Sequence, residues 1–181
     1  WIHPVGAFDS RTAETKNNTM PFTIDSLLTR DRVHLDIEAT SKKQVLQLLS
    51  HHLAQSADDA SADEIFEALF ERERLGCTAA DCGLAIPHAR MPEVRTVRGV
   101  LLRLAKPIDF DSSDNRDVDL IFGFVIPSAD DEARADALRR LMQHLVDPAL
   151  ARRLRNARDE NEVLAAVTGI EAPADMAAGQ D

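Results

Sequence analysis

The chain has 181 residues, of which 44% are hydrophobic, and its formal net charge is −10 at pH 7. This length suits one domain with tails, and the acidic balance without a long Lys or Arg run disfavours direct binding of nucleic acid or of an anionic membrane. No apolar stretch approaches the roughly 20 residues of a spanning helix. We therefore expect a cytoplasmic protein without membrane insertion.

The two ends differ in composition from the rest of the chain. Residues 1–20 mix Pro, Gly, Asn, Thr and charged residues without periodicity, and residues 171–181 are rich in Ala, Pro, Gly and Asp. Such segments favour flexible tails, and the first could also be an addition to the natural sequence. Between them lies no linker or repeat, so one domain over residues 21–170 is predicted.

The first predicted helix starts at Ser41. Ser41 and Gln44 have the spacing of a capping box, and apolar residues follow at helical spacing up to Leu53. His51 and His52 lie near its end, where a cationic side chain favours the helix dipole. For this pair we expect contact with solvent rather than catalysis.

A second helix and two strands follow. Ser61 and Glu64 repeat the capping-box spacing, and Gly76 stands where a helix C-terminus is expected. The run 97–104 combines branched residues with partial alternation, which favours a strand. The run 118–126 is almost uninterruptedly apolar, which is typical of a central strand covered on both faces.

The remaining elements are helical. Apolar residues at helical spacing occupy 130–147, the pair Asp147-Pro148 resembles an N-cap with a first-turn proline, and Asp159 precedes a last helix that should end at Gly169. Helices and strands thus alternate along the chain. The sequence predicts a single-domain α/β fold with a mixed β-sheet flanked by helices.

One histidine follows a proline between the second helix and the 97–104 strand. Pro87 has a fixed φ, so we expect His88 at the end of a strand in a restricted orientation. A neutral imidazole is nucleophilic near pH 7 and can carry a phosphoryl group, for which Arg72, Thr78 and Arg90 are nearby candidate ligands. The local residues alone leave open whether His88 is reactive or an idle surface histidine.

A wider pattern surrounds this histidine. The run Phe70-Glu71-Arg72-Glu73-Arg74-Leu75-Gly76-Cys77-Thr78, followed by Gly83-Leu84-Ala85-Ile86-Pro87-His88, resembles the signature of enzyme IIA components of the bacterial phosphotransferase system. The resemblance is to the fructose/mannitol and nitrogen-related (EIIA-Ntr) branch. It extends over roughly residues 21–168 and includes the segments Ser41-Lys42-Lys43, Pro107-Ile108-Asp109-Phe110 and 118–127.

The resemblance implies a compact α/β sandwich of the mannitol/nitrogen IIA type and a phosphohistidine at His88. The phosphoryl donor would be a histidine phosphocarrier protein of the HPr or NPr type, and nitrogen-branch members regulate target proteins by phosphorylation-dependent binding. Arg72 matches an arginine near the family's active site, and Thr78 matches the threonine of its Ser-Thr pair. No cofactor or metal is implied.

Three positions depart from the family pattern. Arg134 aligns with a second active-site histidine; its guanidinium can contact phosphate but cannot shuttle a proton. Asp81 and Ala89 stand where glycine is usual. Two alternatives therefore stay open beside a regulatory IIA protein: a phosphorylation-deficient binding module of the same fold, and a sugar-specific IIA that passes phosphate to a separate IIB.

Two further groups of residues have simpler interpretations. The spacing of Cys77 and Cys82 is wider than that of the usual zinc-ligand pair, so we expect turn or buried cysteines. A group of arginines near the C-terminus is predicted to be a solvated helix face, with a docking surface for an acidic partner as the alternative: Arg152, Arg153, Arg155 and Arg158.

Overall fold

A computed structural model of the protein describes residues 24–55, 60–128 and 132–168. Its helices are α1 (Ile24–Leu27), α2 (Lys42–Ala54), α3 (Ala62–Arg74), α4 (Glu132–Leu145), α5 (Pro148–Asn156) and α6 (Glu160–Thr168), with short 3-10 helices η1 (Arg30–Arg32) and η2 (Asp81–Gly83). The strands are β1 (Val33–Ile37), β2 (Ala79–Ala80), β3 (Leu84–Ala85), β4 (His88–Met91), β5 (Arg98–Ile108) and β6 (Val118–Pro127). The predicted tails, 1–20 and 171–181, and Gly169 lie outside the described residues.

The strands form one mixed sheet, as predicted. Its order is β1-β5-β6-β3-β2, and β4 also pairs with β6 beyond the end of β3. β6 runs antiparallel to β5 and parallel to β3 and β4. Every residue of β6 except Asp119 is buried, which confirms the central strand predicted from the apolar run.

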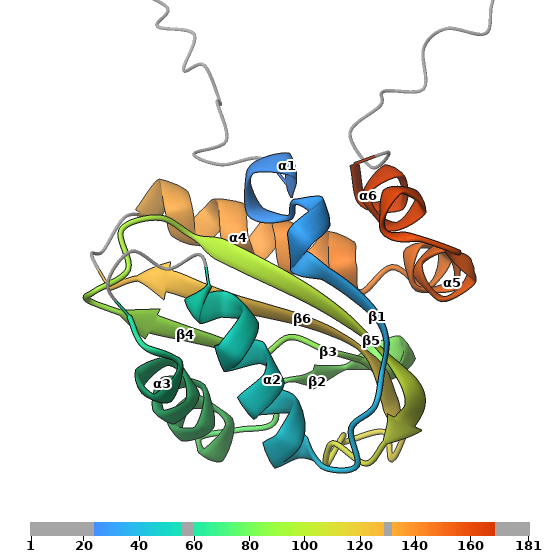
Figure 1. The fold of residues 1–181 in the computed structure, drawn as a ribbon, viewed down its shortest axis with the longest axis horizontal. Helices are drawn as coiled ribbons and strands as arrows, with labels where there is room; N and C mark the ends of the chain where they lie inside the picture. Colours follow the sequence, from blue (N-terminus) through green and yellow to red (C-terminus); the bar gives the residue numbers. More distant parts are fainter. Residues whose placement is uncertain (1–23, 56–59, 129–131, 169–181) are drawn as a thin grey trace, which may run out of the picture.

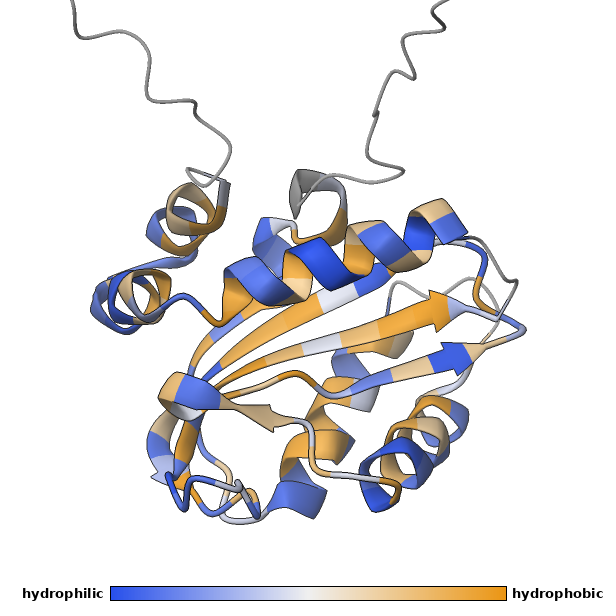
Figure 2. Ribbon diagram, turned by 180° about the vertical axis from the view of Figure 1, so that it is seen from behind, coloured by the Kyte–Doolittle hydropathy of each residue, from blue (hydrophilic) through white to orange (hydrophobic). Residues whose placement is uncertain are grey.

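Helices cover both faces of the sheet (Figure 1). α2 and α3 pack on one face, where the core includes Ile121 and Val125 of β6. α1, α4, α5 and α6 pack on the other, over Phe122 and Phe124. Figure 2 shows hydrophobic strands between helices whose outer surfaces are hydrophilic. Alternate residues of β6 thus serve two separate cores.

The helix caps follow local sequence signals. The Ser61 hydroxyl accepts the amide of Glu64 at 3.3 Å, and the Glu64 carboxylate accepts the amide of Ser61 at 2.8 Å. Ser41 caps α2 in the same way, but the Gln44 side chain accepts from Thr40, so the reciprocal half of the predicted box is shifted by one residue. The Asp147 cap is also confirmed: its side chain accepts the amide of Ala149 at 3.0 Å.

α2 approaches β6 closely at one glycine. A Cβ on Gly123 would lie 2.6 Å from a methyl group of Leu49, closer than real Cβ contacts permit. The hydrogen in place of a side chain at Gly123 therefore lets the helix and the central strand pack in direct contact.

Two surface predictions need correction. The His52 ring is half-buried and stacks on His34 of β1 with ring centroids 3.7 Å apart, so it is not a solvent-facing helix end. Of the C-terminal arginines, Arg152, Arg153 and Arg158 are exposed as predicted, but Arg155 is half-buried. Arg155 binds both carboxylate oxygens of Asp119 and, at 2.5 Å, the Cys82 carbonyl. These contacts join β1 to α2 and α5 to β6. Among the described residues, no helix is long and apolar enough to cross a bilayer.

Candidate functional site

The chain reaches His88 through a tight turn. β2 and β3 pair antiparallel on either side of η2, within which Cys82 has a φ of 67° and Gly83 a φ of 72°. Glycine adopts this left-handed backbone without strain. A Cβ at Gly83 would also lie 2.8 Å from the Arg155 guanidinium, so glycine here permits both the turn and its contact with α5.

His88 opens a strand rather than ending one, which corrects the prediction. β3 stops at Ala85, and Pro87 interrupts the strand because it has no backbone N–H. Its carbonyl still accepts the Phe124 amide at 2.9 Å, and β4 then continues the parallel pairing with His88 opposite Phe124. The break therefore places a half-buried histidine along the sheet instead of at its end.

The His88 imidazole has a defined hydrogen-bonding arrangement. Its Nδ1 lies 2.9 Å from the carbonyl oxygen of Ile86. A carbonyl can only accept, so Nδ1 carries the proton and Nε2 carries the lone pair. Burial lowers the pKa of His88, the Ile86 contact opposes this, and the charges of Arg72 and Arg90 lower it further. The ring is thus held neutral with Nε2 as its nucleophilic atom.

Positive charge lies near this ring. Arg72, in the last turn of α3, is half-buried, and its charge acts on the pKa of His88. One of its Nη atoms donates to the Gly76 carbonyl at 3.1 Å. A guanidinium has five N–H donors, so this contact leaves others for an anion at His88. The structure therefore brings Arg72 and His88 together from separate elements.

A buried carboxylate organises the turn behind the histidine. Glu73 is only 8% exposed; it accepts the Thr78 hydroxyl at 2.5 Å and the Thr78 amide at 3.2 Å. Lys42 of α2 binds the same carboxylate at 3.0 Å. The Thr78 carbonyl in turn accepts the Ile86 amide at 2.9 Å. Lys42, Glu73 and Thr78 thus fix Ile86, whose own carbonyl orients His88.

Glu73 was missed as a site residue from the sequence, although a signal was present. It follows Ile65 and Leu69 at intervals of four on α3, and these three are the buried residues of that helix. Residues four apart share a helix face. The spacing therefore indicated that the Glu73 carboxylate points inward, where a charge needs a partner.

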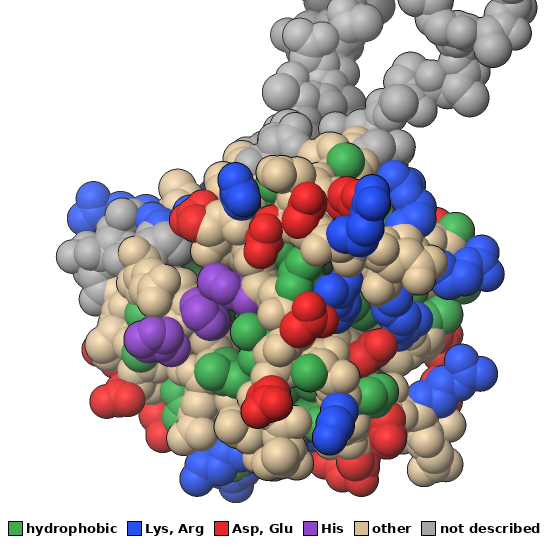
Figure 3. Space-filling model, turned by 45° about the vertical axis from the view of Figure 1, so that its right-hand side comes forward, with side chains coloured by type: hydrophobic (Ala, Val, Ile, Leu, Met, Phe, Trp, Pro, Cys, Tyr) green, Lys and Arg blue, Asp and Glu red, His purple; other side chains and the backbone are tan. Residues whose placement is uncertain are grey.

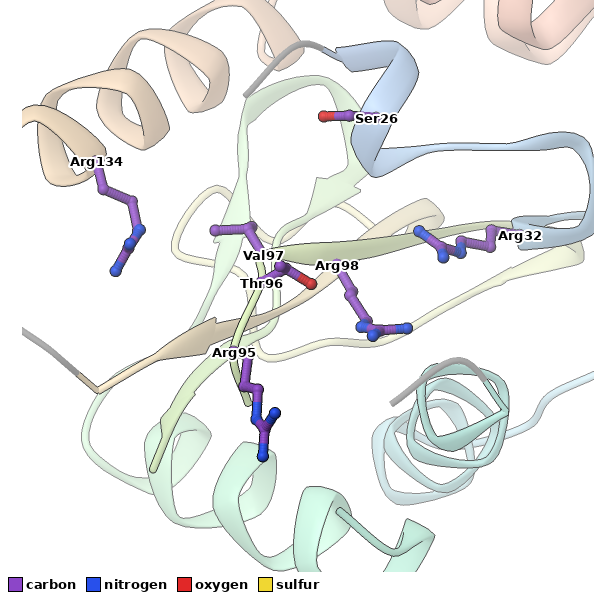
Figure 4. Close-up of a pocket in the computed structure, with 7 residues that line it drawn as sticks. All are labelled: Ser26, Arg32, Arg95, Thr96, Val97, Arg98 and Arg134. Atoms are coloured by element: carbon purple, nitrogen blue, oxygen red, sulfur yellow. The ribbon is translucent and has the colours of Figure 1, made fainter. Parts of the chain in front are cut away.

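The other predicted residues lie in different surroundings. Arg134, near the start of α4, lines a pocket with Arg95 and Arg98 at the beginning of β5 (Figure 4). Asp81 is exposed in η2, and Ala89 is buried in β4 against the α2–α3 core. Of the basic residues predicted as phosphate ligands, Arg72 and Arg90 act on the pKa of His88, whereas Arg134 belongs to this other pocket.

Neither cysteine is arranged for metal binding. The Cys77 thiol donates to the Phe110 carbonyl at 3.1 Å and accepts the Ala79 amide at 3.3 Å, so it acts as a turn-stabilising group. Cys82 is half-buried and unbridged. Within the described ranges, no group of three or more His, Cys, Asp or Glu residues could hold a metal ion.

The chain is similar to known proteins over most of its length. The family model described as "Phosphoenolpyruvate-dependent sugar phosphotransferase system, EIIA 2" matches residues 26–169. A nitrogen regulatory protein of Escherichia coli (strain K12) is 33% identical over 163 residues, which cover 89% of this chain and 99% of that protein.

Solved structures give the same result. The nitrogen regulatory protein IIA-Ntr from Neisseria meningitidis matches with a TM-score of 0.75 and 30% identity, over 80% of this chain and 99% of that one. The mannitol IIA of Escherichia coli matches with a TM-score of 0.64 and 19% identity, over 77% and 98% of the two chains. At 19% identity, the match to the mannitol IIA shows only that the two chains have the same fold.

Proposed function

Because the chain belongs to the EIIA 2 family of the phosphoenolpyruvate-dependent sugar phosphotransferase system, we propose that His88 accepts a phosphoryl group from a histidine phosphocarrier protein. In this proposal the protein is a cytoplasmic regulator of the nitrogen type, which binds target proteins according to its phosphorylation state. The single observation that carries the proposal is the neutral His88 ring, held by Ile86 so that Nε2 is the free nucleophile.

The proposed step is an exchange of one N–P bond for another. The Nε2 lone pair attacks phosphorus while the bond from phosphorus to the donor's histidine breaks, and the electron pair of that bond returns to the donor imidazole. The Nδ1 proton stays hydrogen-bonded to the Ile86 carbonyl. Arg72 supplies positive charge for the phosphoryl oxygens.

Regulation would follow from the added charge. A phosphoryl group brings close to two negative charges and three acceptor oxygens to one place on the surface. Leu75 directly follows α3, three residues after Arg72, and is 85% exposed, an unusual position for a large apolar side chain. Charge at His88 beside an apolar contact would change the affinity of a partner that docks over both.

The experiment is an incubation of the full chain with phosphoenolpyruvate, enzyme I and a phosphocarrier protein. We expect a mass increase of about 80 Da, lost in His88→Ala and retained in His144→Ala, which alters an exposed histidine of α4. An unlabelled wild type would refute the proposal.

The phosphorylation-deficient binding module remains the second candidate. The observation that favours it is the place of Arg134, which aligns with the family's second histidine but lines the pocket beside Arg98. That candidate predicts an unlabelled wild type together with partner binding that is insensitive to His88→Ala.

A further inference from the structure

A polar pocket lies at the start of β5, between η1 and the beginning of α4. It has a volume of about 380 Å³ and is lined by seven residues from four segments: Ser26, Arg32, Arg95, Thr96, Val97, Arg98 and Arg134. Small-molecule sites typically have volumes of roughly 300 to 1,000 Å³. The cavity is therefore large enough for a small ligand.

His88 and this pocket lie on strands that are not direct neighbours. β6 lies between β4 and β5, with His88 opposite Phe124 on one side and Arg98 opposite Val125 on the other. Neighbouring strands are about 4.8 Å apart, which puts β4 and β5 about 10 Å from each other. The arginines whose charges act on the pKa of His88 are Arg72 and Arg90, and neither lines this pocket. The pocket and the histidine therefore have different arginines around them.

The charge of the pocket is opposite to that of the molecule. Four of its seven lining residues are arginines, and none of these seven is acidic, whereas the whole chain has a net charge of −10. Figure 3 shows one face of the molecule, on which acidic and basic side chains lie interspersed. Gathering four guanidinium groups at one cavity raises the local positive potential and favours an anion there.

The donors come from different directions. Figure 4 shows Arg134 reaching from α4 and Arg32 reaching from η1 toward the start of β5, where Arg95 and Arg98 lie. Arg95, Arg98 and Arg134 also have other interactions, but each guanidinium carries five N–H donors in a planar fork. Such forks match the tetrahedral oxygens of phosphate better than a point charge does.

Arg32 supplies a further indication. One of its Nη atoms donates to the Leu27 carbonyl at 3.2 Å, while its buried Nε has no hydrogen-bond partner in the described part of the chain. A buried N–H without an acceptor is unfavourable. The Ser26 and Thr96 side chains on the same lining add hydroxyl donors.

We propose that this pocket binds a small, multiply phosphorylated anion such as a diphosphate or triphosphate. Arginines on separate segments surround the cavity, so a ligand with two or more phosphate groups contacts more of them than a single phosphate does. Such a ligand would hold η1, the start of β5 and α4 together. The site is independent of the phosphoryl group proposed for His88.

The test is calorimetric titration of the full chain with pyrophosphate, adenosine triphosphate and inorganic phosphate. We expect saturable binding of pyrophosphate or of the triphosphate, and at least about tenfold weaker binding of inorganic phosphate. Arg98→Gln and Arg134→Gln should each weaken the polyphosphate by about tenfold or more, the size expected for a lost charged hydrogen bond. Arg139→Gln is the matched control, because it removes the same charge from the exposed side of α4.

Amide chemical shifts place the ligand. Pyrophosphate should perturb Thr96 and Val97, in wild type and in His88→Ala alike. Thr96→Glu, at an exposed position, should abolish binding by charge alone and keeps the test valid if an arginine variant fails to fold. No saturable binding, equal affinities for phosphate and pyrophosphate, equal loss in Arg139→Gln, or shifts centred on His88 would each overturn the proposal.

Discussion

His88 and Arg72 act on each other through charge, although they lie on different elements. Burial lowers the pKa of the imidazole first, and the Arg72 guanidinium lowers it further. In the proposed function, the same guanidinium also attracts the phosphoryl group to that ring. A purely structural residue would not affect both the pKa of His88 and the transfer of a phosphoryl group to it.

Replacing Arg72 therefore has two linked results. In Arg72→Gln we expect the pKa of His88 to rise toward its ordinary value and phosphoryl transfer to slow by at least about tenfold. A pH titration of the His88 ring by NMR and a labelling time course measure both. Arg74→Gln, which removes an exposed arginine paired with Glu71, should leave both values close to wild type. Slower transfer with an unshifted pKa would argue against a direct role.

Glu73 is a positioning residue in this account, because it acts on His88 through Thr78 and Ile86. Glu73→Gln removes the charge that accepts from Lys42 and Thr78 inside the protein. We expect the free energy of unfolding to fall by about 1 to 3 kcal/mol. Urea unfolding checks this against Glu71→Gln on the exposed face of α3, for which the change should stay below about 1 kcal/mol. Equal losses in the two variants would contradict the role given to the buried carboxylate.

At the scale of elements, the contact between α2 and β6 depends on Gly123. A methyl group there would meet Leu49 at 2.6 Å, so Gly123→Ala should destabilise the protein by about 1 to 3 kcal/mol through overpacking. Gly76→Ala is the control, since nothing lies within 4 Å of a Cβ at that position. Thermal unfolding that ranks Gly76→Ala as equally damaging would show that the helix can move away.

The stacked pair His34 and His52 joins β1 to α2, and it makes this junction sensitive to acid. Burial lowers the pKa of both, that of His52 to about 4, while Asp31 and Glu160 partly oppose the shift at His34. The neighbouring charges of His34 and His51 lower the pKa of His52 further. Below pH 6.5, the ordinary pKa of histidine, both rings take up protons in the unfolded chain, whereas in the folded protein they stay neutral to a lower pH. Stability is therefore full above about pH 6.5 and declines as the pH falls toward 4.

Urea unfolding at several pH values tests this junction. His52→Phe keeps a ring for stacking and should show a shallower loss of stability between pH 6.5 and 4 than the wild type. His144→Phe changes an exposed histidine and should follow the wild-type curve. Parallel curves for wild type and His52→Phe would mean that carboxylates alone cause the acid sensitivity.

At the scale of the whole molecule, the longer helices, the two long strands and the mixed sheet were predictable because their signals are local. Ser61 with Glu64, Asp147 with Pro148, and the apolar run of β6 each specify an element from neighbouring residues. The start of β4 at His88 was not predictable in this way, because it depends on the Phe124 amide reaching past Pro87. The stacking of His52 and the arginine pocket likewise depend on segments far apart in the chain.

The candidate site was likewise predictable only where the sequence carries a local pattern. The resemblance pointed to His88 and Arg72, and in the structure the charge of Arg72 acts on the pKa of His88. It did not reveal that Glu73 holds Thr78, or that Arg134 lies beside Arg98. These side-chain contacts join residues of different elements, so they cannot be read from the sequence. The spacing along α3 indicated only that the Glu73 side chain points into the protein.

The central claim concerns one atom, Nε2 of His88. Two-bond ¹H–¹⁵N correlation spectra of the phosphorylated, ¹⁵N-labelled chain identify which imidazole nitrogen bears phosphorus. We predict phosphorus on Nε2 of His88 with the proton retained on Nδ1. Phosphorus on Nδ1, on another histidine or on none would contradict the account.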